Sequence, residues 1–378
     1  MLILCTNCSS NQNTLITYNT GNEELIKIDD ISFEDGSIID LIDSVLIIKL
    51  QSDECLIGEI MQIILTPNNI FVYDDYYGGS VVIFNAEGKF IKRLQTGRGR
   101  GEINRISRIS YNDGVLTTYQ FGMINQFSSN GAFIKNFEYV KLIKDCEFYR
   151  NGYVCIQVEL QNEEGKFKII RENTNFDEEN PISFVPRNRT YALVSDKYLH
   201  YDENGNLLIT RPFDNNIYLY GDTLVNVKYV LDIGNLDMKD YNFTKFDEFK
   251  NKASVGKYYF TGNFFTTKNY HLFRFADKEH QVDVYYNKVS GKCRRLHYYY
   301  FDDKKNYYHN KKITRIGRNV TTTGEYFASY LNYEMLSEDD KKAILRINSI
   351  SSTDKLKIQC LKEDDNPLIV LYRLKDIK

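Results

Sequence analysis

The chain has 378 residues, of which 42% are hydrophobic and 26% are charged, and these proportions exclude wholesale disorder. Its formal net charge is only −3, which argues against a chain built to neutralise a nucleic-acid backbone, so we expect no nucleic-acid partner. Thirty Tyr and 23 Phe favour strands, and with only five Pro the turns must be made by Gly, Asn and Asp. This composition is typical of many short antiparallel strands.

The first residues, MLILCTNCSSNQNT, are similar to the end of a bacterial lipoprotein signal, in which a Cys becomes the lipidated first residue and a polar tether follows. Cys8 fits this role better than Cys5, because Asn7 precedes it and two serines follow it, although the usual small residue before the Cys is absent. Provided that the natural chain starts earlier, we expect residues 1–20 to be a signal remnant and tether, and residues 21–378 to form one domain. The alternative is an ordinary cytoplasmic start with a stray C-x-x-C pair.

The next segments predict strand-turn-strand units that recur along the chain. Ile57–Asp75 alternates around an Asn-Asn turn, and Ile38–Gln51 is consistent with an earlier, degenerate copy. The clearest units are Val81–Leu94 and Ile124–Phe137, which superpose with an offset of 43 residues and share a glycine turn followed by GxFIK. Weaker copies follow in Gln161–Ile170, Asn216–Ile233 and Val282–Leu296.

A spacing of about 40–45 residues, with four short strands per unit, is typical of propeller blades. The sequence therefore predicts an all-β fold, a six-bladed β-propeller of four-stranded antiparallel blades, closed by strands from both ends of the chain. Two short helical insertions are expected. One is Asp237–Lys257, and the other is Leu336–Ile347, where Ser337 is a suitable N-cap and acidic residues fill the first turn.

The segment QTGRGRGEI at Gln95–Ile103 raises the question of a phosphate-binding or nucleic-acid-binding loop. It lacks the spacing and the Lys of a Walker loop, no helical pattern follows it, and a single short RG segment without a strongly basic context is unlike a nucleic-acid-binding segment. We interpret it as a joint between two blades, where glycine permits a sharp turn. Contact with an anion through Arg98 or Arg100 is the alternative.

The tyrosine-rich run at Leu296–Lys312 is a second candidate site. Exposed aromatic rings beside Asp, Asn and Lys can stack on sugar rings, so a glycan could bind there. The other interpretation is an inner propeller strand that is buried on both faces. The candidate ligand-binding residues in this run are Tyr298, Tyr300, Tyr307 and Tyr308.

Several segments carry a family resemblance: IFVYDD, the run VVIFNAEGKFIKRLQTGRGRGEINRI, and the C-terminal LKEDDNPLIVLYRLK. Together they resemble the six-bladed β-propeller lipoproteins of Bacteroidetes, which are similar to NHL- and TolB-type propellers. The resemblance covers roughly residues 8–378. It implies a secreted, lipid-anchored propeller at the outer membrane, but no particular reaction.

The remaining patterns do not predict catalysis. The five histidines, His200, His271, His280, His297 and His309, show no local ligand spacing, and we expect neither a metal nor another cofactor. Asp202–Asn206 is similar to the start of a calcium loop, but Phe213 stands where the closing acid is needed, so a tight turn is expected. The later cysteines are expected to be buried small side chains rather than disulfides. They are Cys55, Cys146, Cys155, Cys293 and Cys360.

These observations favour a non-enzymatic binding or scaffolding module, anchored by lipid through Cys8, that recognises a glycan, peptide or protein at a funnel formed by loops of several blades. We expect it to be a monomer in the cell envelope. The alternative is a propeller lyase or hydrolase with a metal or acidic site on the central axis.

Overall fold

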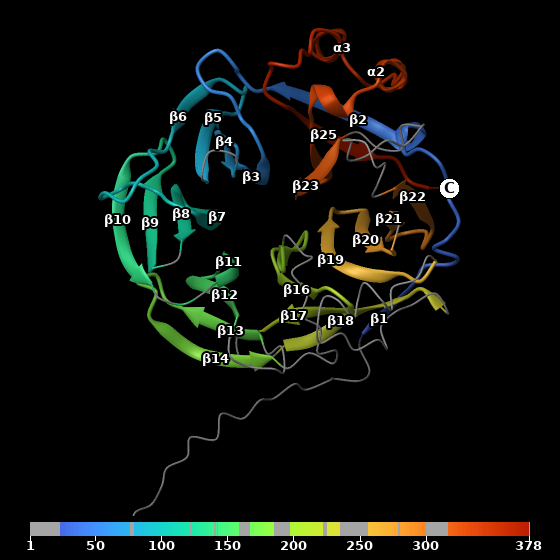
Figure 1. Cartoon of the computed structure of the whole chain (residues 1–378). Coiled ribbons are helices and arrows are strands. Elements are labelled where there is room, and N and C mark those ends of the chain that lie inside the picture. The colour runs from blue at the N-terminus through green and yellow to red at the C-terminus, as the bar shows by residue number, and fades with distance from the viewer. Residues whose placement is uncertain are drawn as a thin grey trace, which may run out of the picture.

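The computed structural model shows a ring of six four-stranded antiparallel sheets around a central axis, so the predicted six-bladed β-propeller is confirmed (Figure 1). The residues that the structure describes are 23–75, 79–120, 122–139, 141, 143–158, 167–184, 197–221, 225–234, 256–278, 280–299 and 317–377.

The first three blades follow the chain from the axis outward. Blade 1 contains β3 (Ile60–Leu65), β4 (Asn69–Asp74), β5 (Ser80–Asn85) and β6 (Phe90–Arg93). Blade 2 contains β7 (Ile106–Asn112), β8 (Val115–Gln120), β9 (Gly122–Ser128) and β10 (Phe133–Tyr139). Blade 3 contains β11 (Ile143–Tyr149), β12 (Gly152–Val158), β13 (Phe167–Glu172) and β14 (Glu178–Phe184).

The next two blades repeat this order, and the first gains an extra strand. Blade 4 contains β15 (Leu199–Tyr201), β16 (Leu207–Arg211), β17 (Asp214–Tyr220) and β18 (Val225–Asp232), with β1 (Glu24–Lys27) parallel to β18 at its outer edge. Blade 5 contains β19 (Tyr259–Thr266), β20 (Tyr270–Ala276), β21 (His280–Asn287) and β22 (Cys293–Tyr299).

Blade 6 closes the ring with strands from both ends of the chain, as the sequence predicted. It contains β23 (Arg318–Thr323), β24 (Tyr326–Leu331), β25 (Leu368–Leu374) and, outermost, β2 (Ile42–Lys49). The strand β2 follows the short 3-10 helix η1 (Ile39–Leu41) and pairs antiparallel with β25, from Ile42 opposite Leu374 to Lys49 opposite Leu368. Ile38–Gln51 is therefore the outer strand of the last blade, and its interpretation as a degenerate copy of its own is wrong.

The hydrophobic core consists of layers between neighbouring blades, because each sheet has two apolar faces. In β4 every residue is buried; Ile70 and Val72 pack toward blade 6, whereas Phe71 and Tyr73 pack toward blade 2. Successive side chains of a strand point to opposite faces, so a strand between two blades needs a continuous apolar run rather than an alternating one. The same packing joins each neighbouring pair of blades in the described structure.

The predicted hairpins are present, but their spacing is uneven. Val81–Leu94 forms β5 and β6, and Ile124–Phe137 forms β9 and β10, both as third and fourth strands. The copy at Gln161–Ile170 differs from these two, because the strand after its turn, β13, is the third strand of its blade and not the fourth. The innermost strands begin at residues 60, 106, 143, 199, 259 and 318, so the later blades are longer than the predicted 40–45 residues.

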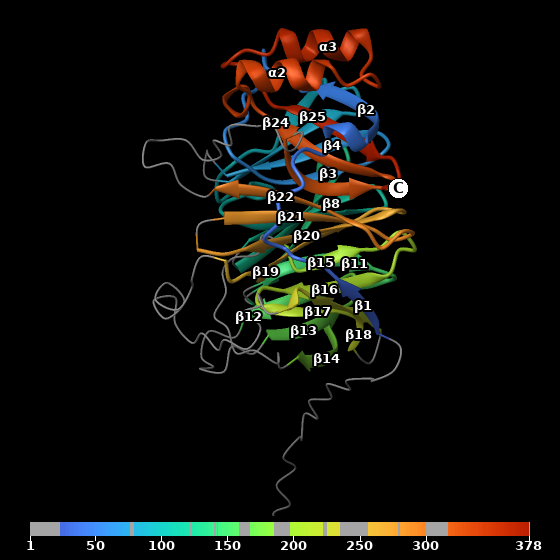
Figure 2. The ribbon, with the colours of Figure 1, turned by 90° about the vertical axis from the view of Figure 1, so that its right-hand side faces the viewer.

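One predicted helical insertion is confirmed, between β24 and β25 (Figure 2). After the 3-10 helix η3 (Tyr333–Met335), helix α2 (Glu338–Leu345) begins with a capping box: the Ser337 hydroxyl accepts from the Asp340 amide, and the Asp340 carboxylate accepts from the Ser337 amide. A second helix, α3 (Ser352–Gln359), was not predicted. Nearly all of the other predicted insertion, Asp237–Lys257, lies outside the described residues.

Candidate binding site

The glycine-rich segment at Gln95–Ile103 is a connection between blade 1 and blade 2, as its interpretation as a joint requires. Glu102 closes it: its carboxylate accepts from the Gly99 amide at 2.6 Å and from the Gln95 side chain at 3.0 Å. Gly101 has φ of +77°, which favours glycine. Arg98 and Arg100 are exposed, and the Arg100 guanidinium lies 5.6 Å from the Phe133 ring centroid. Their role in anion binding stays a prediction.

The tyrosine run does not form the expected inner strand. Its first part belongs to β22, which is the outermost strand of blade 5, so the prediction of an inner strand is wrong. The backbone of Tyr298 pairs with that of Gln281 on β21. The side chain of Tyr298 and the whole of Tyr300, Tyr307 and Tyr308 lie outside the described residues, and so do Cys8 and the lipidation expected there.

The described histidines lie in blades 4 and 5, where the ring centroids of His280 and His297 are 6.5 Å apart. His200 lies on β15, the innermost strand of blade 4, and its Nε2 is 3.0 Å from the Thr210 hydroxyl, whereas His297 Nε2 is 3.0 Å from the Ile31 carbonyl. His271 is buried among aromatic rings, and His280 Nδ1 lies 3.1 Å from Asp277. Within the described part of the chain, no group of three or more His, Cys, Asp or Glu is arranged to hold a metal ion. The fifth histidine, His309, lies outside the described residues.

An open groove of about 510 Å³ lies where the turns of three blades end on the same face of the ring. We call it the turn groove. It is lined by the ends of β7 and β11 and by the turn between β15 and β16. Its lining residues are Tyr111, Asn112, Phe148, Tyr149, Arg150, Tyr201, Asn204, Gly205 and Asn206. Aromatic faces with amide donors and acceptors give this groove the chemistry of a polar, ring-shaped ligand site.

The aromatic rings of the turn groove are fixed by packing behind them. Tyr111 lies 4.9 Å from Phe71 between ring centroids, and Phe148 packs edge-on against Tyr153 at 5.1 Å. The Tyr201 hydroxyl donates to the Phe148 carbonyl, which joins blades 3 and 4 at the groove floor. A ligand would therefore meet rings whose orientation is set before binding, which lowers the entropic cost of association.

The turn at Asp202–Asn206 is the predicted tight turn, and it shapes the amide side of the groove. The Asp202 carboxylate accepts from the Asn204 amide at 2.9 Å and from the Asn206 amide at 2.8 Å. Burial favours a higher pKa for Asp202, but the hydrogen bonds from Lys228 and Asn206 outweigh it and hold the pKa below its ordinary value. The carboxylate is thus committed to the turn, and Asn204 stays exposed at the groove.

Two smaller cavities, of about 80 and 40 Å³, lie along the inner strands near the axis. Tyr201 lines both the turn groove and the 80 Å³ cavity, and Lys197 lines both small cavities. The 40 Å³ cavity is lined by residues of four blades and by Lys197, which precedes β15 of a fifth. They are Ile60, Met61, Gln62, Arg108, Lys197, Asn263, Phe265, Arg274, Arg318, Asn319 and Val320.

Buried carboxylates lie behind these cationic residues. Arg108 Nε donates to Asp145 at 2.6 Å, and Asp145 also accepts from the amides of Tyr198 and Leu199, so it joins blades 2, 3 and 4. Burial favours a higher pKa for Asp145, but the charge and hydrogen bond of Arg108 outweigh it and lower the pKa. Burial, aided by the positive charge of Lys197, lowers the pKa of His200 to about 3, so His200 is neutral at pH 7.

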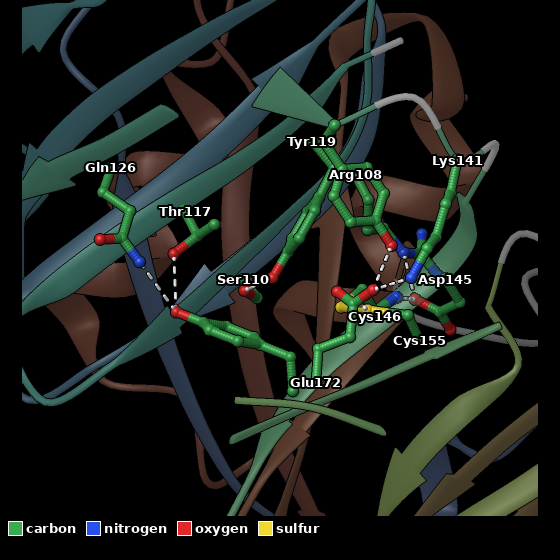
Figure 3. Close-up of a disulfide and its surroundings, with 12 residues drawn as sticks. Arg108, Ser110, Thr117, Tyr119, Gln126, Lys141, Asp145, Cys146, Cys155 and Glu172 are labelled. Atoms are coloured by element: carbon green, nitrogen blue, oxygen red, sulfur yellow. Dashed lines mark hydrogen bonds and ion pairs between the residues drawn. A yellow bond between two sulfur atoms is a disulfide. The ribbon is translucent and has the colours of Figure 1, made fainter. Parts of the chain in front are cut away.

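Cys146 and Cys155 form a disulfide across β11 and β12, with a Cα–Cα distance of 4.1 Å (Figure 3). Both were correctly expected to be buried, as was Cys55, but the expectation of no disulfide is wrong. Cys293 is only partly buried and Cys360 is exposed, so the expectation fails for them too. A signal existed in the sequence: Cys146 and Cys155 stand symmetrically about the hairpin turn after Tyr149.

The disulfide lies beside a second buried carboxylate. Glu172 on β13 accepts from the Tyr139 hydroxyl at 2.9 Å and from the Lys141 ammonium at 2.8 Å, and its other oxygen is 3.8 Å from the Cys155 sulfur. Figure 3 shows Glu172, Lys141, Arg108 and Asp145 gathered around the disulfide. Blades 2 and 3 are thus linked near the disulfide by the Arg108–Asp145 ion pair and by the hydrogen bond from Tyr139 to Glu172.

Comparisons with known proteins support the fold and identify a family. A family model described as a domain of unknown function (DUF4934) matches residues 24–373. A candidate exported protein of Bacteroides fragilis has a similar structure, with a TM-score of 0.67, 14% identity, and coverage of 93% of this chain and 100% of that chain. This similarity shows the shared propeller fold.

Two further solved structures are only distantly similar. A protein of unknown function from Bacteroides caccae has 9% identity, a TM-score of 0.38, and coverage of 70% of this chain and 82% of that one. The glutaminyl cyclase of Myxococcus xanthus has 9% identity, a TM-score of 0.35, and coverage of 63% and 92%. Neither similarity is close enough to inform function. No curated protein matches the chain. In the described structure, no helix is both long and apolar enough to span a membrane.

Proposed function

The chain belongs to the family described as a domain of unknown function (DUF4934), and from this premise we propose that it is an exported, lipid-anchored propeller that binds a glycan in the turn groove. The observation that carries the proposal is the lining of the groove. Four aromatic side chains and three asparagines from three blades converge on a space of about 510 Å³. Ligand pockets of roughly 300–1,000 Å³ with aromatic walls and a few polar groups hold small molecules.

The chemistry of the groove favours a sugar over a charged peptide. Sugar rings present apolar C–H faces that stack on aromatic rings, and their hydroxyls pair with amides that both donate and accept. Among the described residues that line the turn groove, only Arg150 carries a formal charge, and its guanidinium lies 5.1 Å from the Tyr149 ring centroid. A neutral glycan therefore matches the groove better than an acidic or basic peptide.

The disulfide supports export. Disulfides form and persist in oxidising compartments such as the periplasm and are rare in the cytoplasm. Cys146 and Cys155 are fully buried, in keeping with a structural bridge rather than a redox-active pair. Together with the polar tether that follows Cys8, this favours a location in the cell envelope.

The lipid anchor is tested by labelling cells with a fatty-acid probe. We expect the protein to incorporate the label, Cys8→Ser to abolish it, and Cys5→Ser, the matched control, to keep it. Equal labelling of wild type and Cys8→Ser would refute Cys8 as the attachment point.

Glycan binding is tested with a glycan array that also carries peptides, probed with a soluble form that begins at residue 23. We expect binding to glycans, and a loss of about five- to thirtyfold in Tyr111→Ala and Asn204→Ala, because each removes a contact worth roughly 1–2 kcal/mol. Tyr333→Ala removes an exposed tyrosine outside the groove and serves as the control. Binding to peptides alone, or equal binding by all variants, would contradict the proposal.

A lyase or hydrolase with a metal or acidic site on the axis is the weaker candidate. The described residues that line the axial cavities include one histidine, His200, and no carboxylate. The enzyme would need a group that activates water or withdraws a proton, and the lining supplies mainly guanidinium, ammonium and amide groups. This part of the molecule is better suited to holding a ligand than to transforming one.

A further inference from the structure

The axial cavities have a lining whose charge has one sign. Arg108, Lys197, Arg274 and Arg318 all line the 40 Å³ cavity, and no carboxylate is among its described lining residues. Arg108 and Arg274 are only 5% exposed. Each cationic residue comes from a different blade or from the segment that enters one, so the closed ring itself brings them together.

The carboxylates that pair with these cations lie outside the cavity lining. Asp145 pairs with Arg108 at 2.6 Å, Asp283 with Arg274 at 2.7 Å, and Glu147 with Lys197 at 3.0 Å. A cavity whose described lining holds four cationic side chains, while Asp145, Asp283 and Glu147 are not among the lining residues, has a positive potential. Like charges that face one space repel each other unless a negative group enters it.

The amides in the same lining are suited to an oxyanion. Asn263 and Asn319 line the cavity beside Arg274 and Arg318. The Asn319 side chain is held by a donation to Tyr285 at 2.8 Å and by acceptance from Tyr372 at 2.6 Å. A cavity needs about 10–15 Å³ for one water molecule, so 40 Å³ is on the scale of a carboxylate or sulfate group.

We propose that the axis of the propeller is a binding site for a small oxyanion, with Lys197 and Arg318 as its adjustable ligands and Arg108 and Arg274 as its fixed cationic wall. Guanidinium groups bind carboxylate, sulfate and phosphate oxygens through charge-assisted hydrogen bonds. The anion could be a free ion or the acidic substituent of a sugar. This site is separate from the turn groove and does not depend on glycan binding there.

The experiment is calorimetric titration of the soluble protein with sodium sulfate, inorganic phosphate and D-glucuronate, with D-glucose as the neutral match for glucuronate. We expect one-to-one binding of at least one anion and none of glucose at the axis. Binding of sulfate or phosphate alone would assign a free ion, and tighter binding of glucuronate would assign an acidic sugar.

Variants distinguish anion binding at the axial cavity from a general effect of salt on the protein. Lys197→Gln and Arg318→Gln should each weaken anion binding about tenfold, because each removes a charged hydrogen-bond donor. Arg318→Lys should retain part of the affinity. Lys342→Gln removes an exposed cation on α2 and should change nothing. Thermal unfolding in the absence of anion shows that each variant is folded. Absence of anion binding in the wild type, or equal weakening by Lys342→Gln, would overturn the proposal.

Discussion

Two interfaces between blades, which we call seams, are held together by different kinds of polar contact. At the seam of blades 2, 3 and 4, the Asp145 carboxylate binds Arg108 and the amides of Tyr198 and Leu199. At the seam of blades 5 and 6, the hydroxyls of Tyr285 and Tyr372 lie 2.9 Å apart, and both hydrogen-bond to the Asn319 side chain. All of these central groups are buried, but only the first seam carries charge.

This difference indicates which seam contributes more to stability and which contributes more to ligand binding. A buried ion pair contributes little net stability, yet removing one partner costs much, because a charge is left buried alone. A neutral network of hydroxyl and amide groups costs less to break. The ionic seam places Arg108 in the lining of the 40 Å³ axial cavity, whereas the neutral seam places Asn319 there. We therefore expect the ionic seam to determine how the free energy of unfolding changes with acid and which charge a ligand of the cavity carries.

The largest effect should follow from breaking the ionic seam. Asp145→Ala leaves Arg108 buried without its carboxylate and removes the acceptor of two amides, so we expect a loss of about 3–5 kcal/mol in the free energy of unfolding. Chemical denaturation measures this change. A loss below about 1 kcal/mol would show that the seam is not structural.

Acid should destabilise the chain through His200, which follows Leu199 of the ionic seam. The pKa of His200 is about 3 in the folded chain, below its ordinary value of 6.5, so the unfolded chain binds an extra proton between these values. Stability should therefore fall as pH falls from about 6.5 toward 3, by up to about 1.4 kcal/mol per pH unit. Denaturation of His200→Gln across this range should show a shallower decline. An unchanged slope would refute the burial of a neutral His200.

Breaking the neutral seam should have a smaller effect without pH dependence. Tyr372→Phe removes one hydroxyl, so we expect a loss of about 1–2 kcal/mol that is the same at pH 5 and pH 8, because no group of this seam titrates there. Denaturation at pH 5 and pH 8 measures both the size of this loss and its independence of pH. A loss as large as that of Asp145→Ala would erase the proposed distinction between the seams.

The smallest effects should come from the glycine-rich joint between blades 1 and 2. Gly101 has φ of +77°, and a Cβ there would lie 2.9 Å from the Phe133 ring, so Gly101→Ala should cost about 1 kcal/mol. Arg98→Gln should change stability by less than about 0.5 kcal/mol, because Arg98 is exposed. Thermal unfolding of the two variants checks this contrast. Equal losses would refute the interpretation of the glycines as the structural part of the joint.

The fold was more predictable than the site because features of the fold depend on neighbouring residues, whereas the site depends on residues that are far apart in the sequence. The hairpins, the capping box at Ser337 and the joint at Gly101 are local, and each needs only a few neighbouring residues. Closure by strands from both ends of the chain was predictable because a ring must join its ends, but β2 itself was not recognised as the closing strand. The tyrosine run was placed wrongly because a strand rich in aromatic residues looks alike at inner and outer positions.

The turn groove and the axial cavity could not be found from local pattern. Tyr111, Phe148 and Asn204 stand on three blades and meet only because the blades are arranged in a ring. The cations Arg108 and Arg318 are far apart in sequence and show no shared motif. The disulfide was the exception, because two cysteines at equal distances from one hairpin turn are a local signal.

Hydrogen–deuterium exchange with the best-binding glycan tests the turn groove most directly. We predict that the glycan slows exchange at the ends of β7 and β11 and at the turn between β15 and β16, around residues 111–114, 148–151 and 201–206, while blade 6 is unchanged. Protection confined to other surfaces, or no protection at a saturating glycan concentration, would contradict glycan binding in the groove.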